Sequence, residues 1–256
     1  MEIRKILFTT DLENQPSSLD LVKQILPLQE LGLEHMFFLQ NSRFDTRLEG
    51  LSQSQVEGRI IVDEELSLSR ILKVAEEEDV SLIVTNLSKH KARAAGGLII
   101  KKLIRGASRP ILFANNTIDQ MAEPDEKGLF GHIVFATDWS LESEKALSYL
   151  LGLKRLLGEL EIVNVIDRKL TIRDMRELKE RLAQTRKKFL DEKIDAESHI
   201  YAGKTSEEIF TAAKDYKATM IVIGGDSEKK GIKGLFKKGS SYKIPNEAAL
   251  PVLVVT

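Results

Sequence analysis

The sequence contains no cysteine, one tryptophan and only six prolines among its 256 residues. The absence of cysteine excludes disulfide bonds, thiolate metal sites and cysteine nucleophiles. Lys and Arg number 38 against 39 Asp and Glu, for a formal net charge of −1, so the chain lacks the basic excess typical of nucleic-acid binding. No apolar run approaches the roughly 20 residues that span a bilayer. We therefore expect neither a nucleic-acid partner nor a membrane partner.

The sequence also lacks obvious targeting and metal-binding patterns. Its first residues show no basic-then-apolar signal pattern, and we expect a cytoplasmic protein. No two histidines stand at a spacing typical of metal ligands, so we expect no metal site. The four are interpreted as structural or surface residues: His35, His90, His132 and His199.

Apolar segments recur in the same order in the two halves of the chain, which indicates an internal repeat. The corresponding segments are 5–12 with 132–139, 81–86 with 219–224, and 109–114 with 250–255. The offset grows from 127 residues between Asp11 and Asp138 to 141 residues between Pro110 and Pro251. The second half therefore has extra residues, which we place mostly between its second and third strands.

The repeated segments are short, rich in β-branched residues and apolar on both faces, as in strands of a buried parallel sheet. Between them, apolar residues recur at helical spacing. The expected helices include Leu66–Glu78, Leu141–Leu157 and Glu207–Tyr216. This alternation predicts an α/β fold of two tandem open five-stranded parallel sheets with helices on both faces. The predicted domains are 1–116 and 131–256, with a turn-forming, charged linker at 117–130.

The additional residues of the second half predict a polar helix at Thr171–Leu190. Its apolar side comprises Met175, Leu178, Leu182 and Phe189. Before the next helix, Gly203-Lys204-Thr205 ends like a phosphate-binding loop, but the glycine that such a loop requires is replaced by Ser198. We instead expect Thr205 to be a helix N-cap with Glu208 completing a capping box.

Ligands of parallel α/β sheets bind beyond the carboxyl ends of the strands. After the fourth strand of the second half, residues 224–241 contain five glycines and five lysines and close in Gly239-Ser240-Ser241. Glycines allow close backbone approach to a phosphate, and a helix start offers free N–H groups. The two alternatives are a phosphate cradle and a solvated surface loop.

These segments resemble the universal stress protein family over nearly the whole chain. The resemblance rests on the strand that ends in Thr137-Asp138, the strand that ends in Ile223-Gly224, the glycine-rich loop and the final strand at 251–255. It implies an adenine nucleotide alpha hydrolase-like fold. In ATP-binding members the loop reads Gly, two residues, Gly, nine residues, Gly, then Ser or Thr.

By this resemblance Asp138 faces the adenine and Val165 packs against it, whereas the glycine-rich loop holds ribose and phosphates. The candidate cofactors are ATP and Mg²⁺. The candidate nucleotide-binding residues are Asp138, Val165, Ile223, Gly224, Gly225, Gly239, Ser240 and Ser241. The first half has Asp11 but carries Leu98 where the loop's hydroxyl belongs, so we expect the site in the second half only.

The loop departs from the family pattern. Ser227 replaces its second glycine, and Asp226 and Glu228 would repel a triphosphate by about 1 kcal/mol or more at a partly screened site. Three hypotheses follow. The first is a stress-response-type regulatory protein that binds adenine nucleotide without significant turnover. The alternative is a scaffold or interaction protein without nucleotide, and a weak ATPase ranks lowest.

Two further features concern pairing and catalysis. In the scaffold hypothesis the two halves pair through their final strands, 111–114 and 252–256, and a homodimer is a second expectation. Ser140 and Ser143 follow Asp138, but no histidine lies beside them as a base, so a Ser-His-Asp arrangement depends on the fold. Trp139 covers either the ligand pocket or the helix that follows it.

Overall fold

The computed structural model describes residues 2–9, 19–40, 51–52, 54–64, 66–86, 97–114, 128–225 and 240–256. The first half contains β1 (Lys5–Thr9), α1 (Leu19–Ile25), the 3₁₀ helix η1 (Leu26–Leu31), β2 (His35–Gln40), β3 (Glu57–Val62), α2 (Leu68–Glu77), β4 (Leu82–Asn86), α4 (Gly97–Gly106) and β5 (Ile111–Ala114). The second half contains the 3₁₀ helix η5 (Gly128–Phe130), β6 (His132–Ala136), α5 (Leu141–Gly152), β7 (Glu159–Ile166), α6 (Ile172–Asp191), β8 (Asp195–Ala202), α7 (Thr205–Asp215), β9 (Met220–Gly224), α8 (Ser240–Glu247) and β10 (Val252–Val255).

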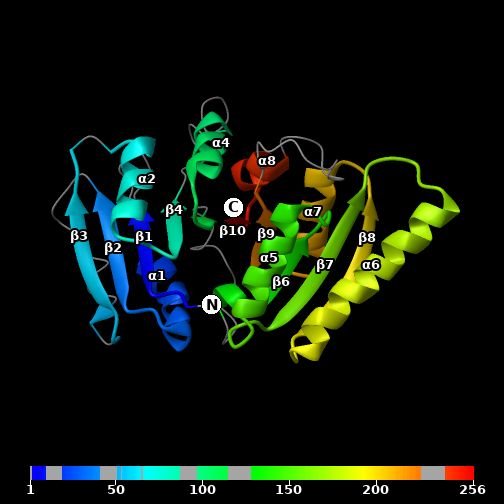
Figure 1. Ribbon diagram of the computed structural model, residues 1–256, viewed down its shortest axis with the longest axis horizontal. Coiled ribbons are helices and arrows are strands. Elements are labelled where there is room, and N and C mark those ends of the chain that lie inside the picture. The colour runs from blue at the N-terminus through cyan, green and yellow to red at the C-terminus, as the bar shows by residue number, and fades with distance from the viewer. Residues whose placement is uncertain are drawn as a thin grey trace.

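The strands form one continuous sheet in which the second half repeats the first. The order is β3-β2-β1-β4-β5-β10-β9-β6-β7-β8, and the strands within each half are parallel. The halves join at their final strands, which pair antiparallel with Leu253 opposite Leu112 and Val254 opposite Ile111. These are the strands expected at the junction from the sequence. Figure 1 shows the two halves side by side along the sheet.

Helices cover both faces of the sheet, which explains why its strands are apolar on both sides. In β10, Leu253 and Val255 belong to the core beneath α1, α5 and α6. The alternate residues Val252 and Val254 belong to the core beneath α2, α4, α7 and α8. The predicted α/β class with a parallel sheet and helices on both faces is therefore confirmed.

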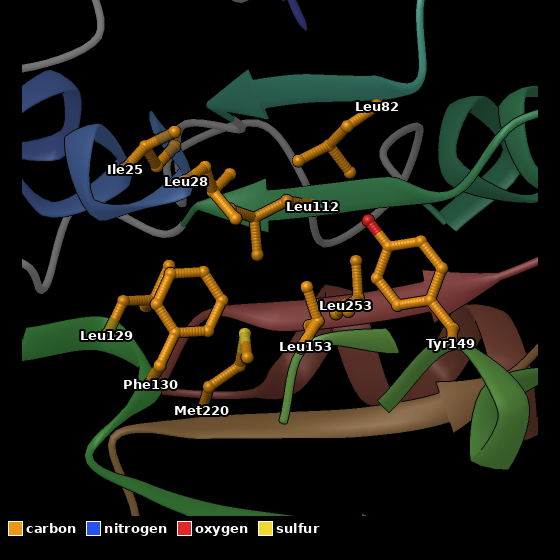
Figure 2. A pocket seen from close by; sticks show the side chains of 10 residues that line it. All are labelled: Ile25, Leu28, Leu82, Leu112, Leu129, Phe130, Tyr149, Leu153, Met220 and Leu253. Atoms are coloured by element: carbon orange, nitrogen blue, oxygen red, sulfur yellow. The ribbon is translucent and has the colours of Figure 1, made fainter. Parts of the chain in front are cut away.

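On the α1 and α5 side, apolar residues of both halves meet at the junction. They leave a cavity of about 10 Å³, which is about the space of one water molecule. Figure 2 shows the facing side chains, among them Leu28, Leu82 and Leu112 from the first half and Leu129, Phe130 and Leu253 from the second. This side of the junction is packed core with no room for a ligand of nucleotide size.

Helix α6 accounts for the extra length of the second half. It lies between β7 and β8, and its N-terminus carries a capping box formed by Thr171 and Asp174. Leu178, Leu182 and Phe189 are buried, as predicted, and α6 packs along β8 in Figure 1. The opposite side of the helix consists mainly of exposed charged residues, so the amphipathic pattern determines which face meets the sheet.

The predicted cap of α7 is wrong. Lys204 is the N-cap residue and makes no side-chain capping bond. Its carbonyl accepts the first helical hydrogen bond, from the N–H of Glu208 at 3.0 Å, so Thr205 is already inside the helix. Thr205 is also 5% exposed, and its burial within the first turn decided its position over its capping tendency.

Part of the predicted linker belongs to the core. Residues 128–130 form η5, and Leu129 and Phe130 are buried. The domain limits 1–116, 117–130 and 131–256 stay a prediction, because residues 115–127 are outside the described ranges. Each helix within the described ranges falls short of the length and hydropathy that crossing a bilayer requires.

Candidate functional site

The chain reverses its direction across the sheet between β6 and β9. From β6 it runs outward to β7 and β8, then returns to β9 and β10 on the other side of β6. Such a switch leaves a crevice beyond the carboxyl ends of the two strands, where ligands of open α/β sheets bind. The register aligns Ala136 of β6 with Ile223 of β9. Asp138 and Gly225 therefore follow two residues later, on the two sides of this switch.

Asp138 is held in one orientation by the start of α5. Its side chain is 6% exposed, and its Oδ1 accepts hydrogen bonds from Ser140 N at 3.0 Å and from Ser143 Oγ at 2.6 Å. Ser140 is also the N-cap of α5, since its hydroxyl accepts a bond from Ser143 N. A carboxylate at a helix N-terminus is favoured by the helix dipole. The two serines thus orient Asp138 and cap α5.

Val165 and Ile223 belong to the buried core on the α7 and α8 side. They are 3% and 2% exposed, and Ile209 of α7 and Ile244 of α8 belong to the same cluster. Val165 pairs with Tyr201 of β8 near the carboxyl end of β7. The two apolar side chains support this edge of the sheet, and their contact with a base stays a prediction.

The two glycines at the carboxyl end of β9, Gly224 and Gly225, differ in the space around them. A Cβ on Gly224 would lie 2.5 Å from the Glu142 carbonyl carbon and 2.6 Å from Ser143 N. Only glycine therefore fits where β9 passes the first turn of α5. Gly225 has more room, with Val255 O at 3.3 Å from its ideal Cβ, and its N–H donates to that oxygen at 2.7 Å. Packing by itself explains glycine at 224.

The remaining members of the predicted site are at the start of α8. Gly239 and the preceding loop lie outside the described residues, as do the side chains of Ser240 and Ser241. The helix that begins at Ser240 packs against α4 of the first half, with the Lys101 ammonium 5.3 Å from the Tyr242 ring centroid. The phosphate-binding role of the loop stays a prediction.

Trp139 makes a contact that neither sequence interpretation included. Its backbone is left-handed, with φ of 57°, and its indole N–H donates to Thr185 Oγ1 of α6 at 3.0 Å. The Arg181 guanidinium carbon lies 5.7 Å from the ring centroid. Trp139 therefore fastens the loop after β6 to the additional helix α6.

Among the residues that the structure describes, no histidine reaches Asp138 and its two serines to form a Ser-His-Asp triad. His132 and His199 direct their Nε2 atoms to the Glu161 carboxylate at 3.0 Å and 2.6 Å. This cluster lies on the α7 side of the sheet, whereas Asp138 bonds to the first turn of α5 on the other side. In the first half, α4 begins at Gly97, within the expected helix start, and Leu98 is exposed. Asp11 is outside the described residues.

The sequence interpretation missed the pairing of Glu161 with two histidines. It considered only spacings between histidines, whereas Glu161 and its two histidine partners come from three different strands. One local signal was available, because Glu197 and His199 are two residues apart on a strand and so point to the same face.

Comparison with known proteins agrees with this architecture. The model of the Universal stress protein family matches residues 129–256. The crystal structure of a universal stress protein from Archaeoglobus fulgidus is similar with a TM-score of 0.67 and 18% identity, covering 100% of this chain and 97% of that one. A second structure, from Pseudomonas aeruginosa, has a TM-score of 0.64 and 19% identity, covering 99% and 93%. No curated protein matches the sequence.

Proposed function

The chain belongs to the universal stress protein family, and we propose that it is a stress-response regulatory protein that binds ATP or another adenine nucleotide in its second half. The site comprises Asp138 after β6, Val165 in β7, Gly224 at the end of β9, Gly225 directly after it, and the start of α8. Mg²⁺ would neutralise phosphate charge beside the acidic residues of the loop.

The position of Asp138 at the strand-order switch is the observation that carries the proposal. The switch between β6 and β9 is where an open α/β sheet offers a crevice, and Asp138 and Gly225 flank it. The described residues fit this ligand in two respects. The Asp138 carboxylate is already oriented by Ser140 and Ser143, so the side chain loses little conformational entropy when a base binds. Gly225 has no side chain that would cover the backbone.

We further propose that the site binds without significant turnover. Hydrolysis requires a group that activates water. His132 and His199 are engaged with Glu161 on the other side of the sheet. Binding would instead stabilise the second half and, through the shared β5–β10 junction, the whole sheet.

The test is a thermal-shift titration of the full chain with ATP and Mg²⁺, beside AMP and a buffer control. Trp139 is the single tryptophan and directly follows Asp138, so its emission provides a second readout on the same samples. We expect a saturable rise in melting temperature with a change in emission. No shift up to millimolar nucleotide would overturn the proposal.

Two matched variants locate the site. Asp138→Asn keeps an oxygen for the bonds from Ser140 and Ser143 but removes the carboxylate, and we expect it to weaken binding at least tenfold. Asp11→Asn changes the corresponding residue of the first half and should leave binding intact. Equal losses in both variants would contradict a site restricted to the second half, and phosphate release that Asp138→Asn abolishes would contradict binding without turnover.

One observation favours the scaffold alternative. Gly224 is required by its packing against α5, and Asp138 Oδ1 is used by the α5 cap, so both residues have a role without any ligand. In that case the nucleotide titration would be flat. The exposed charged side of α6 is then the first surface to examine for a protein partner.

A further inference from the structure

A second group of chemically active side chains lies away from the nucleotide edge, on the side of the sheet that α7 covers. Glu161 of β7 is at its centre, level with Val134 of β6 and Glu197 of β8. Val134 is four residues before Asp138, which places the group roughly 13 Å along the strand direction from that residue. The two sites are therefore separate in space.

Glu161 is a buried carboxylate between two imidazoles. It is 7% exposed, its Oε1 lies 3.0 Å from His132 Nε2, and its Oε2 lies 2.6 Å from His199 Nε2. The second carboxylate, that of Glu197, approaches the same place. One ligand atom from each of Glu161, Glu197 and His199 lies within 4.8 Å of the others.

The ring of His199 is oriented by a contact at its other nitrogen, Nδ1. Its Nδ1 lies 3.0 Å from the hydroxyl of Tyr216, which follows the last residue of α7. When Nδ1 carries the proton and donates it to Tyr216, the lone pair of Nε2 points to the two carboxylates. A histidine that coordinates a metal is usually held in this way, with its other nitrogen bonded to a fixed neighbour.

His132 completes the arrangement by occupying the other oxygen of Glu161. The Nε2 atom of His132 contacts Oε1 of Glu161, so Oε2 is the Glu161 oxygen directed to His199. A further carboxylate lies beside the group, since Glu159 Oε2 is 3.5 Å from His132 Nδ1. A cation is the ligand that this field favours.

From this geometry we propose that Glu161, Glu197 and His199 bind a divalent transition metal, with Zn²⁺ as the best match. Two carboxylates and one imidazole are ligands that zinc accepts, and three protein ligands leave a fourth position for water. Ligand atoms at about 2.1 Å from a tetrahedral zinc are roughly 3.4 Å apart. Glu161 Oε2 and His199 Nε2, now 2.6 Å apart, would separate by less than 1 Å.

The competing description is a network held by protons alone, in which His199 donates to Glu161. It accounts for the His199–Glu161 contact, but it assigns no interaction to the Glu197 carboxylate. The metal description uses both carboxylates and the orientation set by Tyr216. The two descriptions differ in whether the protein takes up one metal ion with saturation.

The test uses the full chain, stripped with a chelator and titrated with Zn²⁺ by calorimetry and with Co²⁺ by visible absorption. We expect one ion per chain and the intense visible bands of a four-coordinate Co²⁺ centre. Glu197→Gln is the decisive variant, because Glu197 is exposed and its change should not disturb folding. It should weaken metal binding at least tenfold.

Two further variants separate coordination from nonspecific uptake. Tyr216→Phe removes the bond to His199 Nδ1 and should weaken binding about tenfold or more. His35→Gln changes a His–Glu pair of the first half, where His35 Nδ1 is 3.3 Å from Glu57 Oε2, and should change binding less than twofold. Absence of saturable binding would overturn the proposal, as would binding that Glu197→Gln leaves unchanged.

Discussion

Gly224→Ala tests whether packing alone requires glycine at this position, without any ligand. The added methyl group would lie 2.5 Å from the carbonyl carbon of Glu142 and 2.6 Å from the N of Ser143. Both atoms are backbone in the first turn of α5, so no side chain can rotate away. The helix start would have to move by about 1 Å to restore ordinary contact.

The displaced turn also includes Ser143, which bonds to the α5 cap residue Ser140 and helps to orient Asp138. Overpacking of this kind costs typically about 1–3 kcal/mol. Taking about 2 kcal/mol, and a shift of about 2–4 °C per kcal/mol for a chain of this size, the melting temperature should fall by about 4–8 °C. The fall should occur without any nucleotide present.

The assay is thermal unfolding followed by far-UV circular dichroism, with Gly225→Ala as the matched control. At Gly225 the nearest atom is 3.3 Å from the ideal Cβ, so this variant should lose clearly less stability. Gly97→Ala is a second control, because nothing lies within 4 Å of its Cβ, and it should be neutral or slightly stabilising. Equal melting temperatures for Gly224→Ala and Gly225→Ala would refute the packing argument.

Three other changes test the helix and the junction. Hydrogen bonds from Thr171 hold the pKa of the exposed Asp174 carboxyl below its usual value. The stabilisation from this cap should therefore be complete above the pKa that Asp174 has in the unfolded chain, and it should be lost as the pH falls through the pKa that Asp174 has in the folded chain. Thr171→Ala should move the folded-state pKa back up, which an NMR titration measures. Thr185→Val leaves the indole N–H of Trp139 without its acceptor and should cost about 1–3 kcal/mol in urea denaturation, with altered Trp139 emission, whereas an unchanged midpoint would contradict the contact. Leu253→Ala opens the apolar junction and should cost about 2–5 kcal/mol while both halves still unfold in one transition; two separate transitions would show that the halves are not coupled.

Much of the fold could be predicted from local pattern. Apolar runs on both faces identify strands of a covered parallel sheet, and the matched order of these runs identifies two equivalent halves. The growing offset between the halves located the insertion that became α6. Its buried side, Leu178, Leu182 and Phe189, followed from helical spacing alone, because that spacing is a local property of the chain.

Local pattern was less reliable where a local tendency competes with tertiary packing. Thr205 has the side chain of a good N-cap, yet it is buried inside α7 and Lys204 takes the cap position. The helix predicted to extend to Leu157 ends at Gly152, and Leu156 and Leu157 are buried after it. In both cases contacts with the sheet outweighed the propensity of single residues.

The amino-acid sequence alone determined the class of fold, the repeat and the edge of the sheet where Asp138 lies, because apolar periodicity and the succession of strands and helices along the chain are local properties. Only the tertiary structure decided that Gly224 is a packing glycine and that Trp139 is tied to α6. It also decided that Glu161 gathers His132 and His199 from strands on either side. These contacts join residues far apart in sequence, and the register between strands, which no local pattern contains, brings them together.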